Sequence, residues 1–214
     1  VGNFRNLNMA IKAGADAIYF GIKEFNMRDL AKNFTLRDLK KVRKICDISR
    51  VKMYLALNII VYDNELKKIE NIIKKSKGIV DAIICWDMSV IELCRKYKIP
   101  FHISTQASVS NSLEAKFYKK LGAERIVLAR ELNLKQIKKI SKYVDIECFC
   151  HGAMCVAVSG RCFMSQHTHG LSANRGKCAQ LCRRPWSITD DNGNKLKLEN
   201  SRVMSAKEKF SPAK

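Results

Sequence analysis

The 214-residue chain is 47% hydrophobic, so it can bury the core of about one domain, and disorder throughout is excluded. Its 40 Lys and Arg against 20 Asp and Glu give a formal net charge of +20, which favours a polyanionic partner such as RNA, although lysines solvated on helix faces would give the same sum. The sequence has no run of 18 apolar residues and begins without an apolar signal core, so we expect a cytoplasmic protein without a membrane span.

Short apolar runs alternate with helical patterns over the first 150 residues. The runs predict strands at 17–20, 52–60, 82–86, 101–104, 125–129 and 145–149. Apolar residues at helical spacing predict helices within 36–46, 66–73, 90–97, 113–121 and 134–140. This alternation is typical of βαβ units and a parallel sheet.

Polar or reactive residues follow most of the predicted strands. They are Asn58, Trp86-Asp87, Ser104-Thr105-Gln106, Arg130-Glu131 and Cys150-His151. In a (β/α) barrel the carboxyl ends of the strands form the active face, whereas in an open doubly wound sheet they line a crevice. No glycine-rich dinucleotide fingerprint follows the first strand, so we predict an α/β fold, a TIM-barrel-like parallel barrel over residues 1–150.

The pattern changes after this predicted barrel. Residues 151–186 lack clean periodicity, and residues 148–189 contain no Asp or Glu, so we interpret this stretch as an irregular segment built around a ligand. Residues 187–214 form a third region, with a predicted turn at 190–193 between hairpin-like runs and a lysine-rich end.

The cysteines point to metal or thiol chemistry, because nine is an odd number and a chain that looks intracellular disfavours a disulfide framework. Cys155, Cys162, Cys178 and Cys182 form the pattern C-x6-C-x15-C-x3-C. Four thiolates can hold a [4Fe–4S] cluster or a structural zinc ion. Paired C-x2-C knuckles, which structural zinc favours, are absent, but zinc and free redox thiols both stay open.

The other cysteines and the histidines divide by position. Three cysteines lie on apolar faces and are expected in the core: Cys46, Cys85 and Cys94. Cys148 and Cys150 are spare ligands or packing residues, His102 is expected in the core, and His151 is a candidate functional residue. For His167 and His169, metal or phosphate binding and simple solvation are equal alternatives.

The stretch ECFCHGAMC at residues 147–155, continued by VAVSGRCFMS and then by ANRGKCAQLCR, resembles the signature of peptidase family U32. Further segments resemble the same family: GNF at 2–4, AGADAIYFG at 13–21, ALN at 56–58, STQ at 104–106 and LARE at 128–131. The resemblance covers about residues 2–186.

The family is named for collagenase-like proteases, but the resemblance implies a wider chemistry. Members take part in oxygen-independent hydroxylation of pyrimidines, forming 5-hydroxyuridine in tRNA or 5-hydroxycytidine in 23S rRNA with prephenate linked to the reaction, and others hydroxylate the ubiquinone ring. Several carry a [4Fe–4S] cluster on cysteines of this signature. The matching positions here are Cys155, Cys162, Cys178 and Cys182, of which the fourth varies among members.

The sequence also departs from the family pattern. Members usually begin with a strand before GNF and continue with more barrel elements, including an S-x-K-D-L segment that residues 205–209 only weakly echo. We therefore expect an incomplete barrel in this chain, and a partner subunit or an oligomer that completes it.

Three functional hypotheses follow. In an RNA hydroxylase, His151, Arg130 and Glu131 would be catalytic, although Arg130 and Glu131 could instead form a structural ion pair. Arginine suits bidentate recognition of a prephenate-type carboxylate co-substrate. The residues that would bind this co-substrate or the base are Arg28, Asn58, Thr105, Gln106 and Arg161. In a peptidase, Cys150 or Cys155 would act with His151. The third hypothesis is a non-enzymatic, cluster-bearing RNA-binding or partner subunit.

Overall fold

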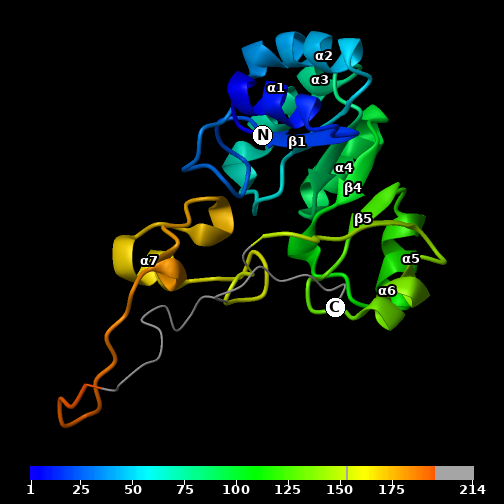
Figure 1. The fold of residues 1–214 in the computed structure, drawn as a ribbon. Coiled ribbons are helices and arrows are strands. Elements are labelled where there is room, and N and C mark those ends of the chain that lie inside the picture. Colours follow the sequence, from blue (N-terminus) through cyan, green and yellow to red (C-terminus); the bar gives the residue numbers. More distant parts are fainter. Residues whose placement is uncertain (153, 196–214) are drawn as a thin grey trace.

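The computed structural model describes residues 1–152 and 154–195, and it contains one six-stranded sheet (Figure 1). The strands are β1 (Ala17–Gly21), β2 (Lys52–Ala56), β3 (Ala82–Cys85), β4 (Phe101–Ile103), β5 (Arg125–Val127) and β6 (Asp145–Glu147). All neighbouring strands are parallel, and their order in the sheet is their order in the chain. The six predicted strands are confirmed, although five of them end one to four residues earlier than predicted.

Helices connect the strands in sequence. They are α1 (Phe4–Lys12), α2 (Leu39–Ile48), α3 (Leu66–Ser76), α4 (Met88–Tyr97), α5 (Ser112–Lys120), α6 (Leu134–Ile140) and α7 (Met164–His169). Short 3₁₀ turns are η1 (Leu36–Asp38), η2 (Asp63–Glu65), η3 (Thr105–Ala107), η4 (Ala173–Arg175) and η5 (Leu181–Arg183). The five predicted helices are confirmed. The sequence analysis missed α1, which buries only Leu7, and α7, which lies in the non-periodic segment.

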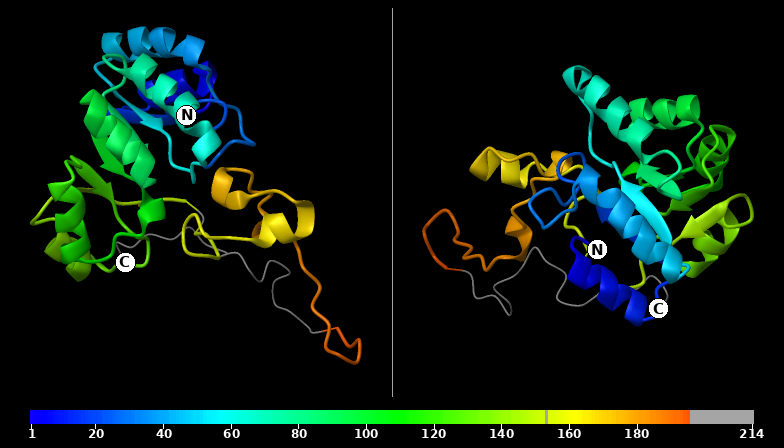
Figure 2. Two further views of the ribbon diagram at one scale, coloured as in Figure 1. Left: turned by 180° about the vertical axis from the view of Figure 1, so that it is seen from behind. Right: turned by 90° about the horizontal axis from the view of Figure 1, so that it is seen from above.

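The core lies between one face of the sheet and helices α2–α5. Alternate strand residues such as Phe20, Leu55 and Ile103 pack there against helix residues such as Val42 and Ile91. The three cysteines expected in the core are all fully buried, as predicted: Cys46, Cys85 and Cys94. Figure 2 shows the helices packed along the outside of the strands, with the cysteine-rich segment to one side of them.

The opposite face of the sheet is concave and more polar. His102 on β4 is 3% exposed, and its ring meets the ring of Tyr54 edge-on, with 4.7 Å between centroids. Burial, with a smaller contribution from Arg125, lowers the pKa of His102 to about 4, so the imidazole is neutral. The residue is buried as predicted, but on the face of the sheet opposite the helix-covered core. Within the described residues β1 and β6 are the two edges of the sheet, so the strands form an open half-barrel.

The described part of the C-terminal region contains the predicted turn. Asp190 accepts hydrogen bonds from the backbone of Asn192 and Asn194, and Thr189 and Lys195 form an antiparallel bridge. Residues 205–209, the weak echo of the family segment, lie outside the described residues. Among the described helices, none combines the length and the apolar character needed to cross a membrane.

Candidate functional site

A cavity of about 370 Å³ opens where the carboxyl ends of the strands face the cysteine-rich segment. The loops after the strands contribute five of the residues predicted to bind or act on substrate: Arg28, Asn58, Thr105, Gln106 and Arg130. The segment contributes three of the predicted metal ligands: Cys155, Cys178 and Cys182. The structure therefore brings together eight candidate residues that are separated by up to 154 positions in the sequence.

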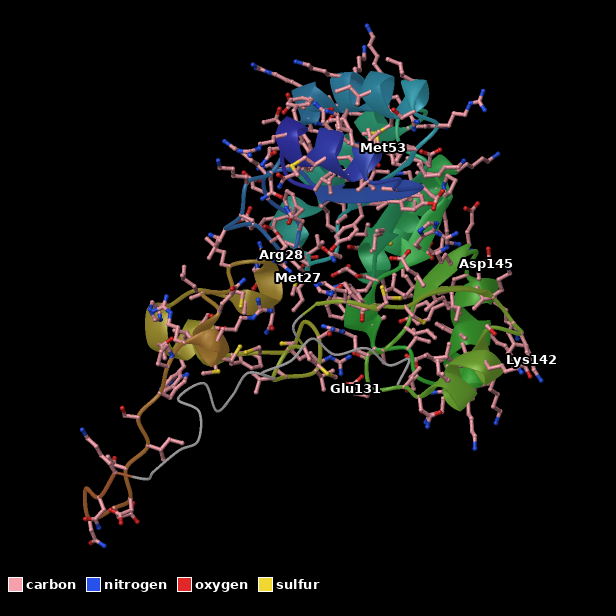
Figure 3. The ribbon with its side chains drawn as sticks, viewed as in Figure 1. Met27, Arg28, Met53, Glu131, Lys142 and Asp145 are labelled. Atoms are coloured by element: carbon pink, nitrogen blue, oxygen red, sulfur yellow. The ribbon has the colours of Figure 1, made fainter. Side chains whose placement is uncertain are left out.

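The loop between β1 and η1 is turned by a buried asparagine. Asn26 donates to the carbonyl of Ile22 at 2.6 Å and accepts from the backbone N–H of Arg28 at 2.9 Å. Asn26 also lies against Gly21, where an added Cβ would come within 2.3 Å of the asparagine side chain. This turn places Met27 and Arg28 between the barrel and the cysteine-rich segment, as Figure 3 shows.

A network of amides links three loops at the bottom of the cavity. The Oδ1 atom of Asn58 accepts from the backbone N–H of Met27 at 3.2 Å. Its Nδ2 group donates to Ser104 Oγ at 3.2 Å and to Gln106 Oε1 at 3.1 Å. Trp86 Nε1 donates to the carbonyl of Asn58 at 3.0 Å. The Asn58 side chain was predicted to bind substrate, but in the structure its hydrogen bonds hold the loops after β1, β2 and β4 together.

Two other predicted residues have fixed positions at the cavity. Thr105 donates to the carbonyl of Leu128 at 3.1 Å, which ties the end of β4 to the end of β5. Arg130 lies over the ring of Phe149, with its Cζ atom 5.0 Å from the centroid, and its Nη2 donates to the carbonyl of Gly152 at 3.0 Å. Arg130 therefore joins the loop after β5 to the start of the cysteine-rich segment.

Two glycines allow the segment to pack tightly against the barrel loops. Gly160 has φ +75° and lies against Gln106, so an added Cβ would be 2.9 Å from Gln106 Cγ. Gly176 has φ +85°, and an added Cβ would be 2.0 Å from the carbonyl oxygen of Asn26. Both positions therefore require glycine for conformation and for space.

An ion pair joins the segment to the loop after β2. Arg175 makes a two-pronged contact with Glu65, with Nη1 2.9 Å from Oε2 and Nη2 2.5 Å from Oε1. The hydrogen bonds from Arg175 hold the pKa of Glu65 below its usual value. Each side chain is only 20% exposed, so the pair is shielded from solvent more than an ordinary surface ion pair.

Two buried polar side chains close the segment on itself. Asn174 Oδ1 accepts from the backbone N–H of Cys162 at 2.7 Å, and Ser165 Oγ accepts from that of Ala179 at 3.1 Å. Asn174 is 6% exposed and Ser165 is 2% exposed. These two bonds bring the stretch that carries Cys162 beside the stretch that carries Cys178.

The donor set fits a centre ligated by four thiolates. All nine cysteines are free thiols. Burial raises the pKa of Cys182, with smaller upward effects from Cys155, Cys178 and Cys162 and an opposing effect from Arg183. Within residues 1–152 and 154–195, no group of three His, Cys, Asp or Glu side chains is already arranged as a metal site. The described residues therefore contain no formed metal site, and a centre shared by the four cysteines stays a prediction.

Four predicted site residues are not among those that line the cavity: Glu131, His151, Arg161 and Cys162. Glu131 and His151 are exposed, and Arg161 is exposed near the phenol of Tyr118. Cys162 is half-buried, and its backbone N–H donates to Asn174. His167 and His169 are exposed on α7, and Cys148 and Cys150 are exposed after β6.

Two further charged residues line the cavity, Glu147 and Arg183, and the sequence analysis named neither as a site residue. Burial raises the pKa of Glu147, against the opposing effect of Arg125, so its proton is held more tightly than in an ordinary carboxyl group. Glu147 ends β6, and the rule that singled out the other strand ends could have found it. Arg183 follows Cys182 directly, and with Arg28 and Arg130 it gives the cavity wall three guanidinium groups.

The comparison with family models decides the relationship. The model described as peptidase family U32 matches residues 2–211. The chain belongs to peptidase family U32. A protein named collagenase from Porphyromonas gingivalis is 42% identical to this U32 chain, over 97% of the chain and 54% of the relative. The 23S rRNA 5-hydroxycytidine C2501 synthase of Escherichia coli is 41% identical, over 89% of the chain and 29% of the relative.

Further bacterial relatives named tRNA hydroxylation proteins are 33–39% identical. Among solved structures, the U32 peptidase Mk0906 superimposes with a TM-score of 0.58 at 14% identity, covering 69% of this chain and 64% of that one, which supports the half-barrel fold. The U32 chain spans about half the length, or less, of the curated relatives described here.

Proposed function

We propose that this U32 chain is the cysteine-bearing part of an enzyme that hydroxylates a pyrimidine of tRNA or 23S rRNA. The observation that carries the proposal is the shared cavity, in which Arg28, Arg130 and Arg183 face the same space as three cysteines of the signature. Relatives with names in RNA hydroxylation, at 33–41% identity, support it.

The arginines of the cavity suit a small substrate that carries carboxylate groups. Guanidinium groups bind carboxylates with two parallel hydrogen bonds, and the wall holds three of them against one carboxyl group, that of Glu147. We therefore assign Arg28 and Arg130 to a prephenate-type carboxylate co-substrate. Gln106 and Thr105 lie at the ends of neighbouring strands and shape the same wall.

We assign Cys155, Cys162, Cys178 and Cys182 as ligands of a [4Fe–4S] cluster, with zinc as the alternative. When bound, such a cluster supplies electron transfer or substrate activation beside the carboxylate pocket. The residues of the chain do the positioning: Asn58 fixes the loops that form the floor, and Arg130 ties the loop after β5 to the segment. His151 and Glu131, both exposed near this face, stay candidates for contact with a larger substrate.

An RNA substrate agrees with the charge of the chain. The net charge is +20, and the segment beside the cavity contains no acidic residue between 148 and 189. Phosphate contacts supply a large share of RNA affinity, and a basic surface at the mouth of the cavity suits them.

Peptidase activity is the second candidate, favoured by the 42% identity with the protein named collagenase. It would use Cys155, which lines the cavity. A cysteine nucleophile needs a base in hydrogen-bond reach, however, and the candidate base His151 does not line the cavity. A third candidate is a cluster-bearing RNA-binding or partner subunit without activity of its own.

The proposal is tested by profiling the modified nucleosides of tRNA and rRNA by mass spectrometry in a deletion strain. A hydroxypyrimidine should disappear and should return with the wild-type gene but not with Arg130→Lys, which keeps the charge and loses the two-pronged geometry. An unchanged nucleoside profile, together with loss of peptide cleavage, would decide for the peptidase.

The cofactor has its own test. The protein purified without oxygen should be brown and contain about four iron and four sulfide ions per chain. A colourless, folded protein with one zinc ion per chain would exclude the iron–sulfur assignment and leave the RNA reaction to be judged by the nucleosides.

A further inference from the structure

Arg175 contacts three residues of the loop that follows β2: Ile60, Tyr62 and Glu65. Its guanidinium contacts both oxygens of Glu65, and Nη1 also donates to the carbonyl of Ile60 at 2.7 Å. Its Cζ atom lies 4.0 Å from the centroid of the Tyr62 ring. The residue thus uses its charge, its fork of donors and its flat face at one place on the barrel.

The anchor for this contact is fixed without Arg175. Glu65 Oε2 also accepts from the backbone N–H of Tyr62 at 2.9 Å, which caps the turn at the start of α3. The carboxylate is therefore held in position before the segment meets it. Holding one partner in advance reduces the side-chain entropy that the ion pair costs when it forms.

The neighbours of Arg175 in the chain connect this anchor to the cysteines. Asn174 on one side binds the backbone of Cys162, and Gly176 on the other packs against Asn26. Cys178 and Cys182 follow within seven residues, and both line the cavity. A displacement of Arg175 would accordingly move three of the four cysteines relative to the barrel loops.

We propose that Arg175 is a positioning residue, whose clamp on Glu65 and Ile60 holds the arm of residues 174–182 so that the cysteines face the cavity. The inference rests on the proposed function in one respect: it assumes that the four cysteines bind one common centre, which gives a reason for holding them in place. Arg175 itself touches neither the cavity nor the sulfurs.

The test compares Arg175→Ala, Arg175→Lys and Arg184→Ala with the wild type, each as the full-length protein prepared without metal. Arg184 is exposed two residues beyond the arm, so its removal makes the same change in charge without breaking the clamp. Hydrogen–deuterium exchange of the amides in 174–183 measures the arm, and exchange in β1–β6 measures the fold. Zinc ion alone, in competition with a chromogenic chelator, probes the four thiols together.

In Arg175→Ala, exchange in 174–183 should be at least about tenfold faster with the strands unchanged, because the arm loses its attachment. Zinc affinity should fall about tenfold or more, in the range seen when groups that orient metal ligands are removed. Arg175→Lys should recover part of both, and Arg184→Ala should match the wild type.

The inference is overturned if exchange in the arm of Arg175→Ala stays at the wild-type rate, or if Arg184→Ala reproduces both effects. If Arg175→Ala also loosens the strands, the Arg175→Lys variant decides on the same two readouts. Faster exchange of the arm combined with no zinc binding by the wild type would support the clamp and count against the shared thiolate centre, so the two failures are distinguishable.

Discussion

Gly176 sits against the backbone carbonyl of Asn26, so close that an added Cβ would lie 2.0 Å from the oxygen. The contact joins the cysteine-rich segment to the loop that carries Arg28, and both sides of it are buried. The carbonyl group of Asn26 thus occupies the space that a side chain at position 176 would need, although the two residues are 150 positions apart in the chain. Neither residue can move away without a shift of its loop.

Gly176→Ala should therefore weaken the protein by more than a positive φ alone explains. Gly170 is the matched control, because it has φ +65° on the same segment and open space where a Cβ would go. The control should cost about 1–2 kcal/mol for the left-handed backbone. Gly176→Ala should cost about 1–3 kcal/mol more for the overpacking. Urea unfolding measures both, and equal losses would contradict the packing seen here.

Asn58→Ala should destabilise the loops that form the cavity floor. The change removes three hydrogen bonds, leaving the Met27 N–H and two acceptors on Ser104 and Gln106 without this partner, and we expect a loss of about 2–3 kcal/mol. Thr105→Val breaks a single bond to Leu128 and should cost about 1 kcal/mol. Chemical denaturation gives both values, and a loss for Asn58→Ala no larger than for Thr105→Val would show that the network is not cooperative.

Stability should fall as the pH drops from about 6.5 to about 4. The pKa of His102 is lowered from 6.5 in the unfolded chain to about 4 in the fold, so between these values the unfolded state binds more protons. The group's contribution is complete above pH 6.5 and falls by on the order of 3 kcal/mol toward pH 4. The charges that act on the ring are Arg125, which lowers the pKa, and Asp145, which raises it.

His102→Phe isolates this effect, because it keeps a ring against Tyr54 and removes the titrating group. Its stability, measured by denaturant unfolding at several pH values, should vary less than that of the wild type over the same interval. The carboxyl group of Glu147, with its raised pKa, acts in the opposite direction and is present in both proteins. Parallel pH profiles for the two proteins would show that His102 is not the cause.

Cys162→Ser should abolish metal or cluster binding, even though Cys162 does not line the cavity. It belongs to the four-cysteine pattern, and the hydrogen bond from its backbone N–H to Asn174 holds its position in the segment. Cys94→Ala, in the core between β3 and α4, should leave the bound metal unchanged. Iron, sulfide and zinc analysis of both variants decides, and full occupancy in Cys162→Ser would remove this residue from the ligand set.

Local patterns were enough for most of the fold. Apolar runs identified all six strands, and helical spacing identified α2–α6, because burial on one face leaves a periodic trace in the sequence. The helix α1 was not predicted although Phe4, Leu7 and Ile11 lie at helical spacing, and all three pack toward the core. The rule that polar residues gather at the carboxyl ends of parallel strands predicted that Asn58, Gln106 and Arg130 lie at one face, and all three line the same cavity.

The rest of the site depends on contacts between distant parts of the chain, which leave no periodic trace. Arg175 and Glu65 are 110 residues apart, and neither position has a pattern that names its partner. The cysteine spacing suggested a common centre but could not show that Arg130, Gly160 and Gly176 each hold the segment to a different loop. The exposed positions of His151 and Glu131 likewise follow from how the chain leaves the strands.

The bonds from Asn174 to Cys162 and from Ser165 to Ala179 also affect how many residues can separate the second and third cysteines of the pattern, which here are fifteen. Both close the base of an excursion whose tip is formed by residues 166–170, on the exposed side of α7. Residues 166–170 are exposed and lie outside the part of the segment that these two bonds hold together. Residues could therefore be inserted or deleted there without moving the cysteines. The number of residues between the second and third cysteines can thus vary, whereas the contacts of Asn174, Arg175 and Gly176 fix the start of the stretch that carries the last two cysteines.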